Sequence, residues 1–325
     1  MTRTTSMLAG LTLASLTLSA NAATIYTFVT VNGPGDNAGG TTVNALSNSG
    51  AIVGFSSNAN MTVLTNFVRD PNGTFVPLSI AGDPLANANG VNSAGVVVGT
   101  TGGQAFFLNN GLLGLLPPAA AGITASETAF GINDLSTIVG QFVDNATDTT
   151  PGFVYANGQF TILNPVANAA VTNAQSANNN GEVAGFYSTD GVHQHGFLFN
   201  TTTDQFTFPA DPVQPNLILT QFLGINDNGI AVGYWQDTAG SQHGFLYDLN
   251  ARTYTFLDDP TEGTNNGLQI TQITGINDSN EIAGFFVDGN GVQRGFVANA
   301  TPEPASALLI GLGLVCVASR KKRSC

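Results

Sequence analysis

Cysteine is almost absent from this chain of 325 residues. Its two cysteines, Cys316 and Cys325, both lie at the C-terminal end. The rest of the chain therefore has no disulfide framework and no zinc site built from thiolates. Its stability must come from the packing of a large chain, and a body of about 280 residues is long enough for one large all-β domain.

Basic residues are also scarce, with 8 Lys and Arg against 21 Asp and Glu. Five of the eight lie in the terminal segments, namely Arg3, Arg320, Lys321, Lys322 and Arg323. Glu303 is the one acid there, so the body has 20 acidic residues against Arg69, Arg252 and Arg294, a net charge of −17. Such a surface repels phosphate backbones and anionic membranes, which argues against a nucleic-acid-binding protein.

The N-terminal segment has the three parts of a secretory signal peptide. Arg3 supplies positive charge, residues 8–18 form an apolar run, and Ala20 and Ala22 form the A-x-A pattern that precedes signal cleavage. We therefore predict a signal peptide over residues 1–22, which does not belong to the folded domain.

An apolar run without charge covers residues 305–319 at the other end. As a helix, this run rises only about 22 Å, short of a roughly 30 Å hydrocarbon core, so it spans a membrane only marginally. The basic cluster behind it predicts a cytoplasmic C-terminus and a body on the other side of the membrane. That cluster consists of Arg320, Lys321, Lys322 and Arg323. The predicted parts are a signal peptide over 1–22, a folded body over 23–300 and a C-terminal segment with a transmembrane helix over 301–325.

The body repeats one pattern six times. The stretch FGINDLSTIVGQFVD (130–144) returns as LGINDNGIAVGYWQD (223–237) and TGINDSNEIAGFFVD (274–288), and weaker copies begin at residues 43, 89 and 175. A glycine after two residues drawn from Ile, Val and Ala recurs every 41 to 51 residues, at Gly54, Gly99, Gly140, Gly185, Gly233 and Gly284. An element such as HGFLF (195–199) follows each glycine, and in five copies a run such as GQFTIL (158–163) follows that element.

Each unit thus has four short runs rich in Ile, Val, Phe and Tyr, separated by residues that favour turns. No segment of the body has sustained helical periodicity, and four strands per unit are typical of a propeller blade. We predict an all-β propeller of six blades. The sixth unit lacks its last strand, whereas the unmatched run TIYTFVTV (24–31) precedes the first unit. We predict that this run completes the sixth blade and closes the ring.

Two sets of repeated polar residues are candidates for chemistry. The pairs Asn133-Asp134, Asn226-Asp227 and Asn277-Asp278 hold the same place in successive repeats, so we interpret them as turn caps rather than catalytic carboxylates. The second set, which precedes polar loops, consists of Asp144, Asp190, Asp237 and Asp288. We assign these to turns as well. Calcium binding at VDGNGVQ (287–293) is the alternative, although this loop lacks the closing Glu of a calcium loop.

The histidines give a weaker signal. His193 and His195 lie two residues apart, a spacing compatible with a metal on one strand face. His243 and Arg294 hold the His195 position in later repeats, which favours a surface or packing role. We predict no catalytic residue, no cofactor and no metal site. We expect Trp235 to take part in aromatic packing between blades and the repeated glycines to relieve crowding.

The C-terminal segment resembles the PEP-CTERM sorting signal of Gram-negative bacteria that make exopolysaccharide. Pro302, Glu303 and Pro304 match the Pro-Glu-Pro motif, and an apolar run and a basic cluster follow in the order of that family. The resemblance implies transient insertion into the inner membrane. It also implies recognition by an exosortase-type membrane protease that cuts near the motif.

The body resembles the extracellular repeats of the HAF family, which are named for a His-Ala-Phe motif. Here the triplet reads His-Gly-Phe at 195–197 and 243–245. That family implies a secreted repeat protein and supplies no activity. We therefore expect a non-enzymatic protein with a structural, adhesive or binding role at the cell surface or in the extracellular matrix, in contact with polysaccharide or surface proteins. The alternatives are a polysaccharide lyase or glycosidase on the same scaffold, with carboxylates around the channel, and a permanently anchored surface receptor.

Overall fold

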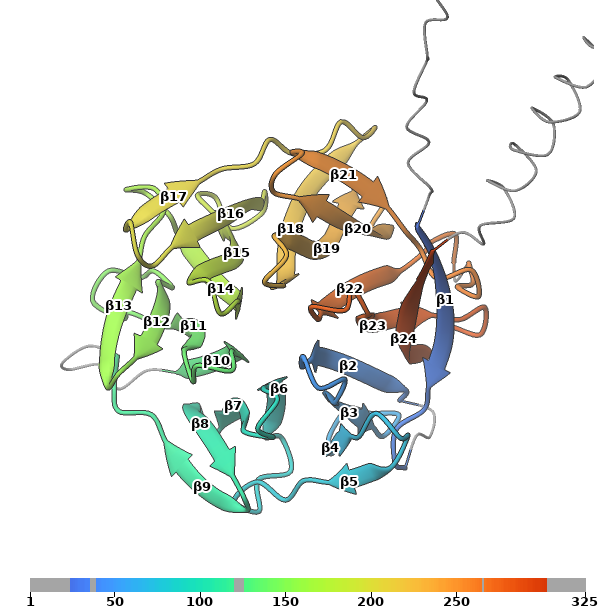
Figure 1. The fold of residues 1–325 in the computed structure, drawn as a ribbon, viewed down its shortest axis with the longest axis horizontal. Helices are drawn as coiled ribbons and strands as arrows, with labels where there is room; N and C mark the ends of the chain where they lie inside the picture. Colours follow the sequence, from blue (N-terminus) through green and yellow to red (C-terminus); the bar gives the residue numbers. More distant parts are fainter. Residues whose placement is uncertain (1–23, 36–38, 120–125, 265, 303–325) are drawn as a thin grey trace, which may run out of the picture. The chain divides into compact units, whose positions relative to one another are not determined.

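The computed structural model describes residues 24–35, 39–119, 126–264 and 266–302. Every regular element within these ranges is a β-strand. The strands form six four-stranded antiparallel sheets arranged around a common centre (Figure 1). Residues 26–300 make one compact unit. The body is therefore a six-bladed β-propeller, as the repeat predicted.

The first three blades follow the chain order from the centre outward. The first blade contains β2 (Thr41–Leu46), β3 (Ile52–Ser57), β4 (Leu64–Arg69) and β5 (Phe75–Pro77). The second contains β6 (Asn87–Val91), β7 (Val97–Thr101), β8 (Gln104–Asn109) and β9 (Leu112–Leu115). The third contains β10 (Glu127–Ile132), β11 (Ile138–Phe142), β12 (Gly152–Ala156) and β13 (Gln159–Leu163).

The fourth and fifth blades have the same order, and the sixth departs from it. The fourth contains β14 (Val171–Ala177), β15 (Glu182–Ser188), β16 (His195–Asn200) and β17 (Gln205–Thr207). The fifth contains β18 (Leu217–Ile225), β19 (Ile230–Asp237), β20 (Gln242–Asp248) and β21 (Thr253–Phe256). The sixth contains β22 (Thr271–Ile276), β23 (Ile282–Val287), β24 (Gln293–Pro302) and β1 (Thr24–Val31).

The N-terminal strand β1 closes the ring. It lies outermost in the sixth blade, hydrogen-bonded to β24 (Figure 1). The Phe28 ring lies 5.1 Å from the Phe296 ring, and Val31 is buried among residues of the first and sixth blades. The prediction that residues 24–31 supply the missing strand is confirmed. Closure removes one free edge and joins the two ends of the domain.

A glycine in the second strand of every blade faces a fully buried phenylalanine in the third. The cross-strand pairs are Gly54–Phe67, Gly99–Phe106, Gly140–Phe153, Gly185–Phe197, Gly233–Phe245 and Gly284–Phe296. A Cβ atom on any of these glycines would lie 1.8 to 2.1 Å from a backbone oxygen of the innermost strand. The repeated glycine therefore relieves crowding, as predicted. It also leaves room for the phenylalanine ring that forms the core of the blade.

The predicted terminal signals lie largely outside the described residues. Strand β24 runs to Pro302, which is the first proline of the Pro-Glu-Pro triplet. Ala20, Ala22, Glu303, Pro304 and the C-terminal basic cluster lie beyond the described ranges. In the part of the chain that is described, no helix is long and apolar enough to cross a membrane.

Candidate functional site

The innermost strand of every blade contains a β-bulge at the same position. The register skips one residue in each of these strands, between Ala129 and Gly131 in the third blade for example. The six residues left out of the pairing are Asn44, Asn89, Phe130, Gln175, Leu223 and Thr274. All six line a central cavity of about 310 Å³. A bulge re-aims the side chain of its extra residue, and here it turns six side chains of five residue types toward the axis of the ring.

Amide side chains dominate this cavity. Three of the bulged residues, Asn44, Asn89 and Gln175, have amide side chains. Three more amides lie two residues before a bulged residue, namely Asn87, Gln221 and Gln272. Phe130, Phe285 and Leu223 supply apolar surface. Among its lining residues none is acidic, basic, a histidine or a tyrosine. The central cavity is thus polar, uncharged and partly aromatic.

Three of the bulged side chains also link neighbouring blades. Asn44 donates from Nδ2 to the carbonyl oxygen of Ala88 at 2.8 Å, and Asn89 donates to that of Ala129 at 2.9 Å. Thr274 donates from Oγ1 to the carbonyl oxygen of Val43 at 2.8 Å. These bonds fix the amide orientation of the two asparagines, since a carbonyl acceptor requires the NH₂ group.

The repeated Asn residues form a second layer where the innermost strands end. In the third blade, Oδ1 of Asn133 accepts from the backbone N–H of Leu135 and Thr137, at 3.1 and 2.8 Å. Its Nδ2 donates at 2.8 Å to the carbonyl oxygen of Asn178 in the next blade. Equivalent interblade bonds run from Asn92 to Asn133, from Asn178 to Asn226 and from Asn226 to Asn277. The predicted turn caps are confirmed, and each also connects two blades.

The residue after each of these Asn residues continues the connection. The N–H of Asp227 donates to Oδ1 of Asp278 at 2.8 Å, and the N–H of Asp278 donates to Oδ1 of Asn48 in the first blade at 3.0 Å. Similar bonds join Ser93 to Asp134, Asp134 to Asn179 and Asn179 to Asp227. The carboxylates of the repeated Asn-Asp pairs therefore serve as acceptors that hold the ring together.

A smaller cavity of about 50 Å³ lies at this end of the channel, lined by Asp134, Asp227 and Asp278. Burial raises the pKa of the Asp278 carboxyl group. The hydrogen bond from the Asp227 N–H opposes that shift, whereas repulsion by the Asp227 and Asp134 carboxylates adds to it. The aliphatic residues Leu46, Val91, Ile132 and Ile276 line both cavities and therefore lie between the amide layer and the acidic layer.

The second predicted set of aspartates caps loops at the other end of the blades. Oδ1 of Asp237 accepts from the N–H groups of Ala239, Gly240 and Ser241 at 2.8 to 2.9 Å. Asp144, Asp190 and Asp288 accept local backbone N–H groups in the same way. A hydrogen bond from the His193 side chain is the largest cause that lowers the pKa of Asp190. The assignment of this set to turns is confirmed.

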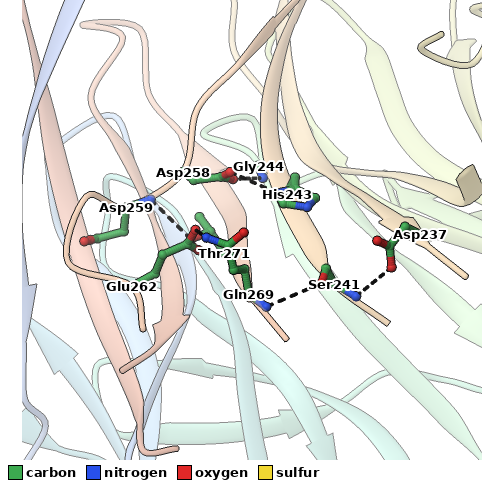
Figure 2. Close-up of polar contacts among 9 residues, drawn as sticks. All are labelled: Asp237, Ser241, His243, Gly244, Asp258, Asp259, Glu262, Gln269 and Thr271. Carbon is green, nitrogen blue, oxygen red and sulfur yellow. Dashed lines mark hydrogen bonds and ion pairs between the residues drawn. The ribbon is translucent and has the colours of Figure 1, made fainter. Parts of the chain in front are cut away.

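The histidines of the two His-Gly-Phe triplets pair with aspartates in the loops that follow the outer strands. Nδ1 of His243 lies 2.9 Å from Oδ2 of Asp258, whose other oxygen accepts from the Gly244 N–H at 2.9 Å (Figure 2). Nδ1 of His195 lies 2.7 Å from Oδ2 of Asp211. The Asp258 hydrogen bond is the largest cause that raises the pKa of His243, against a smaller opposing effect of burial.

Further polar contacts surround His243. Glu262 accepts from Thr271 Oγ1 at 2.7 Å and from Gln269 Nε2 at 3.1 Å (Figure 2). Burial is the largest cause that raises the pKa of Glu262. The indole ring of Trp235 stacks on the His243 ring at 4.6 Å. Trp235 is 7 % exposed and belongs to a core cluster that includes Ala184 and Leu198 of the fourth blade.

His193 and His195 do not converge on one ligand position. His193 binds Asp190 at 2.7 Å, whereas His195 binds Asp211. Across the described ranges, no group of three or more His, Cys, Asp or Glu side chains is arranged to hold a metal ion.

Sequence reasoning missed the bulged residues. Five of them are the first residue of the repeated stretch and Asn44 is the second, but no two neighbouring repeats share the residue type apart from Asn44 and Asn89. Their variation could have identified them, because the surrounding strand residues recur from blade to blade while the channel-facing residue changes.

Comparison with known proteins identifies the C-terminal segment. Residues 300–323 match the PEP-CTERM protein-sorting motif. The chain therefore carries the sorting signal of an exosortase substrate, as Pro302, Glu303 and Pro304 predicted. No curated protein is significantly similar to the chain in sequence.

Solved structures resemble the propeller in fold. A putative TolB from Agrobacterium tumefaciens has a TM-score of 0.53 at 8 % identity, over 86 % of this chain and 99 % of that one. TolB from Acinetobacter baumannii has a TM-score of 0.43 at 9 % identity, over 80 % of this chain and 54 % of that one, so this chain spans about half its length. An oligogalacturonate lyase from Vibrio parahaemolyticus has a TM-score of 0.44 at 11 % identity, over 87 % of this chain and 99 % of that one. At such identities the likeness extends to the fold alone.

Proposed function

We propose that this protein is a secreted, non-enzymatic propeller that an exosortase-type system delivers to the cell surface or to the extracellular polysaccharide matrix. Its role there is structural, adhesive or ligand-binding. The observation that carries this proposal is the match of residues 300–323 to the PEP-CTERM motif. In this proposal the predicted signal peptide over residues 1–22 directs export, and the predicted C-terminal transmembrane segment inserts into the inner membrane until the protease releases the body.

The use of the repeated polar residues supports a non-enzymatic role. The Asn-Asp pairs cap turns and connect blades, and the second aspartate set caps loops. The cavity on the axis has no side chain that could act as a general acid or base. A glycosidase needs two carboxyl groups on opposite sides of the scissile bond.

The body is best described as a set of HAF-type repeats, in which the His-Gly-Phe triplet has a structural role. His243 binds the following loop through Asp258, and Phe245 fills the core of its blade. At Gly244 a Cβ atom would lie 2.5 Å from the carbonyl oxygen of Leu257. Each position of the triplet thus has a packing reason that requires no ligand.

Intact-mass measurement of the protein from its native host tests the sorting proposal. We expect a mature form that lacks residues 1–22 and the segment after the Pro-Glu-Pro motif. A mature form that keeps residues 305–325 would instead favour a permanently anchored receptor. Replacement of Glu303 with Ala is expected to trap the uncleaved form, and Asp204→Ala, at an exposed acidic position, serves as a control outside the motif.

One observation favours an enzyme as the second candidate. His243 and Glu262 both have raised pKa values and lie in one polar cluster. A lyase or glycosidase built on this cluster would degrade polysaccharide at a measurable rate, and Glu262→Gln would abolish the degradation. Absence of activity of the folded protein on neutral and acidic polysaccharides would support the non-enzymatic role.

A further inference from the structure

We infer that the central cavity binds the end of an uncharged saccharide chain. This inference rests on the binding role proposed above and names the class of ligand. Four features of the cavity favour such a ligand: the free hydrogen-bonding groups of its amides, its aromatic surface, its size and the surrounding charge.

Five of the six amide oxygens of the cavity wall have no donor among the described residues; the exception is Oδ1 of Asn87, which accepts from Nδ2 of Asn44 at 3.2 Å. The NH₂ groups of Asn44 and Asn89 are held by backbone carbonyl oxygens of the next blade, which leaves Oδ1 of each as the accessible acceptor. Gln175 donates from Nε2 to Asn173, and Gln272 donates from Nε2 to Gln242. No described residue donates to Oε1 of Gln175 or Gln272. A ligand rich in hydroxyl groups satisfies these acceptors and can also accept from the remaining amide N–H groups.

The bulged side chains differ between the two sides of the ring. Asn44, Asn89 and Thr274 are occupied in interblade bonds on one side of the ring. The bulged residues on the other side of the ring make no side-chain hydrogen bond to a described residue of a neighbouring blade. They are Phe130, Gln175 and Leu223. Their side chains are therefore available to a ligand. An apolar ring face beside an amide matches a sugar, which has a C–H face and a rim of hydroxyl groups.

The charge of the protein selects against ionic ligands. A uronate or phosphate would enter a body with a net charge of −17 and approach Asp134, Asp227 and Asp278 at the far end of the channel. A cationic ligand would find no carboxylate among the residues that line the cavity. A neutral molecule is not repelled by the acidic body and needs no carboxylate partner in the cavity.

The volume of the cavity limits how much of a saccharide can enter. At about 310 Å³ it lies at the lower end of the range for ligand pockets, so it accommodates a terminal unit rather than an internal segment of a long chain. The aliphatic residues Leu46, Val91, Ile132 and Ile276 lie beyond the amide layer, and the cavity on their far side measures only about 50 Å³, too little for a second sugar unit.

Isothermal titration of the full chain tests this inference. The probes are maltotriose, cellotriose and mannotriose as neutral trisaccharides, and trigalacturonate as an anionic trisaccharide of the same length. We expect at least one neutral probe to bind and trigalacturonate not to bind. Gln175→Leu and Phe130→Ala should each weaken binding by about tenfold or more, since each removes one contact.

Matched variants on the outer rim serve as controls. Gln159 is exposed on β13 and Phe208 is exposed after β17. Gln159→Leu and Phe208→Ala should leave the affinity unchanged, and melting curves check that all four variants fold. Preference for trigalacturonate, an equal effect of the rim variants, or no binding of any neutral probe at millimolar concentration would each overturn the inference. Correct removal of the C-terminal segment would in those cases leave the sorting proposal intact.

Discussion

Nδ2 of Asn226 in the fifth blade donates a hydrogen bond to the carbonyl oxygen of Asn277 in the sixth, at 3.0 Å. Oδ1 of the same side chain accepts from the Ile230 N–H at 2.9 Å and so caps its own turn. One buried side chain thus stabilises a local turn and an interface between blades. The same double role recurs in Asn133 and Asn178.

Asn226→Ala is expected to lower the free energy of unfolding by about 1–3 kcal/mol, because it leaves the Ile230 N–H without its cap and removes the interblade bond to the Asn277 carbonyl oxygen, which keeps only the Asn280 N–H as a donor. Asn226→Asp should lower the free energy of unfolding by at least as much. It keeps the turn cap but places a carboxylate against the Asn277 carbonyl oxygen. Denaturant unfolding measures both variants. The control is Asn145→Ala, at an exposed position with no side-chain hydrogen bond in the described residues.

Gly233→Ala is expected to destabilise the fifth blade by about 2–3 kcal/mol or more, because the new Cβ atom would meet the carbonyl oxygen of Gln221 at 1.8 Å. Gly289→Ala is the matched control, since its nearest neighbour would lie 3.9 Å away. Thermal melts of the two variants should differ by several degrees. Equal melting temperatures would contradict the packing role of the repeated glycine.

Ser136→Gly is expected to stabilise the protein by up to about 1 kcal/mol. Ser136 has a φ of 63°, in the left-handed region, whereas Gly50, Gly95, Gly181 and Gly229 hold the same turn position in other blades. Glycine adopts this conformation without the steric cost of a Cβ atom, although it gains more entropy in the unfolded chain. The comparison is made by denaturant titration, and a lower midpoint for the glycine variant would count against this reading of the turn.

Deletion of residues 24–31 behind the signal peptide is expected to lower the melting temperature sharply. The deletion uncovers β24 and removes Phe28 and Val31 from the core of the ring. A synthetic peptide TIYTFVTV added in excess should restore part of the lost stability, because it can occupy the free edge of β24. An unchanged melting curve would show that closure by β1 contributes little.

The His243–Asp258 pair is expected to make stability depend on pH. The pKa of His243 is raised in the folded state, so protonation of His243 stabilises the fold. This contribution to the free energy of unfolding is complete below the pKa of the unfolded chain, about 6.5. That contribution is lost as the pH rises through the folded pKa. Asp258→Asn should reduce this dependence and lower the NMR-observed pKa of His243, because Asp258 is the largest cause of the raised pKa. Asp204→Asn, at an exposed position on the rim, is the control and should leave the titration of His243 unchanged.

Much of the fold was predictable because each blade is specified locally. The alternation of β-prone runs with Asn, Gly and Asp turns predicts four strands per unit, and the truncated sixth copy together with residues 24–31 predicts closure. The Asn-Asp turn caps followed from the same reasoning. The central cavity was not predictable, since it depends on a bulge that turns Phe130, Gln175 and Leu223 toward the axis. A shift of one residue in register reverses the face on which a side chain lies, and periodicity alone does not locate such a shift.

The sequence by itself determined the number of blades, the order of their strands, the means of closure and the sorting signal at residues 300–323. Each of these depends on contiguous residues or on their repetition. Only the tertiary structure decided which side chains meet across blades. Asn226 and Asn277 are 51 positions apart, and His243 on β20 contacts Asp258 in the loop that follows β21. Such contacts depend on how neighbouring blades pack around the axis, and no single repeat contains that information.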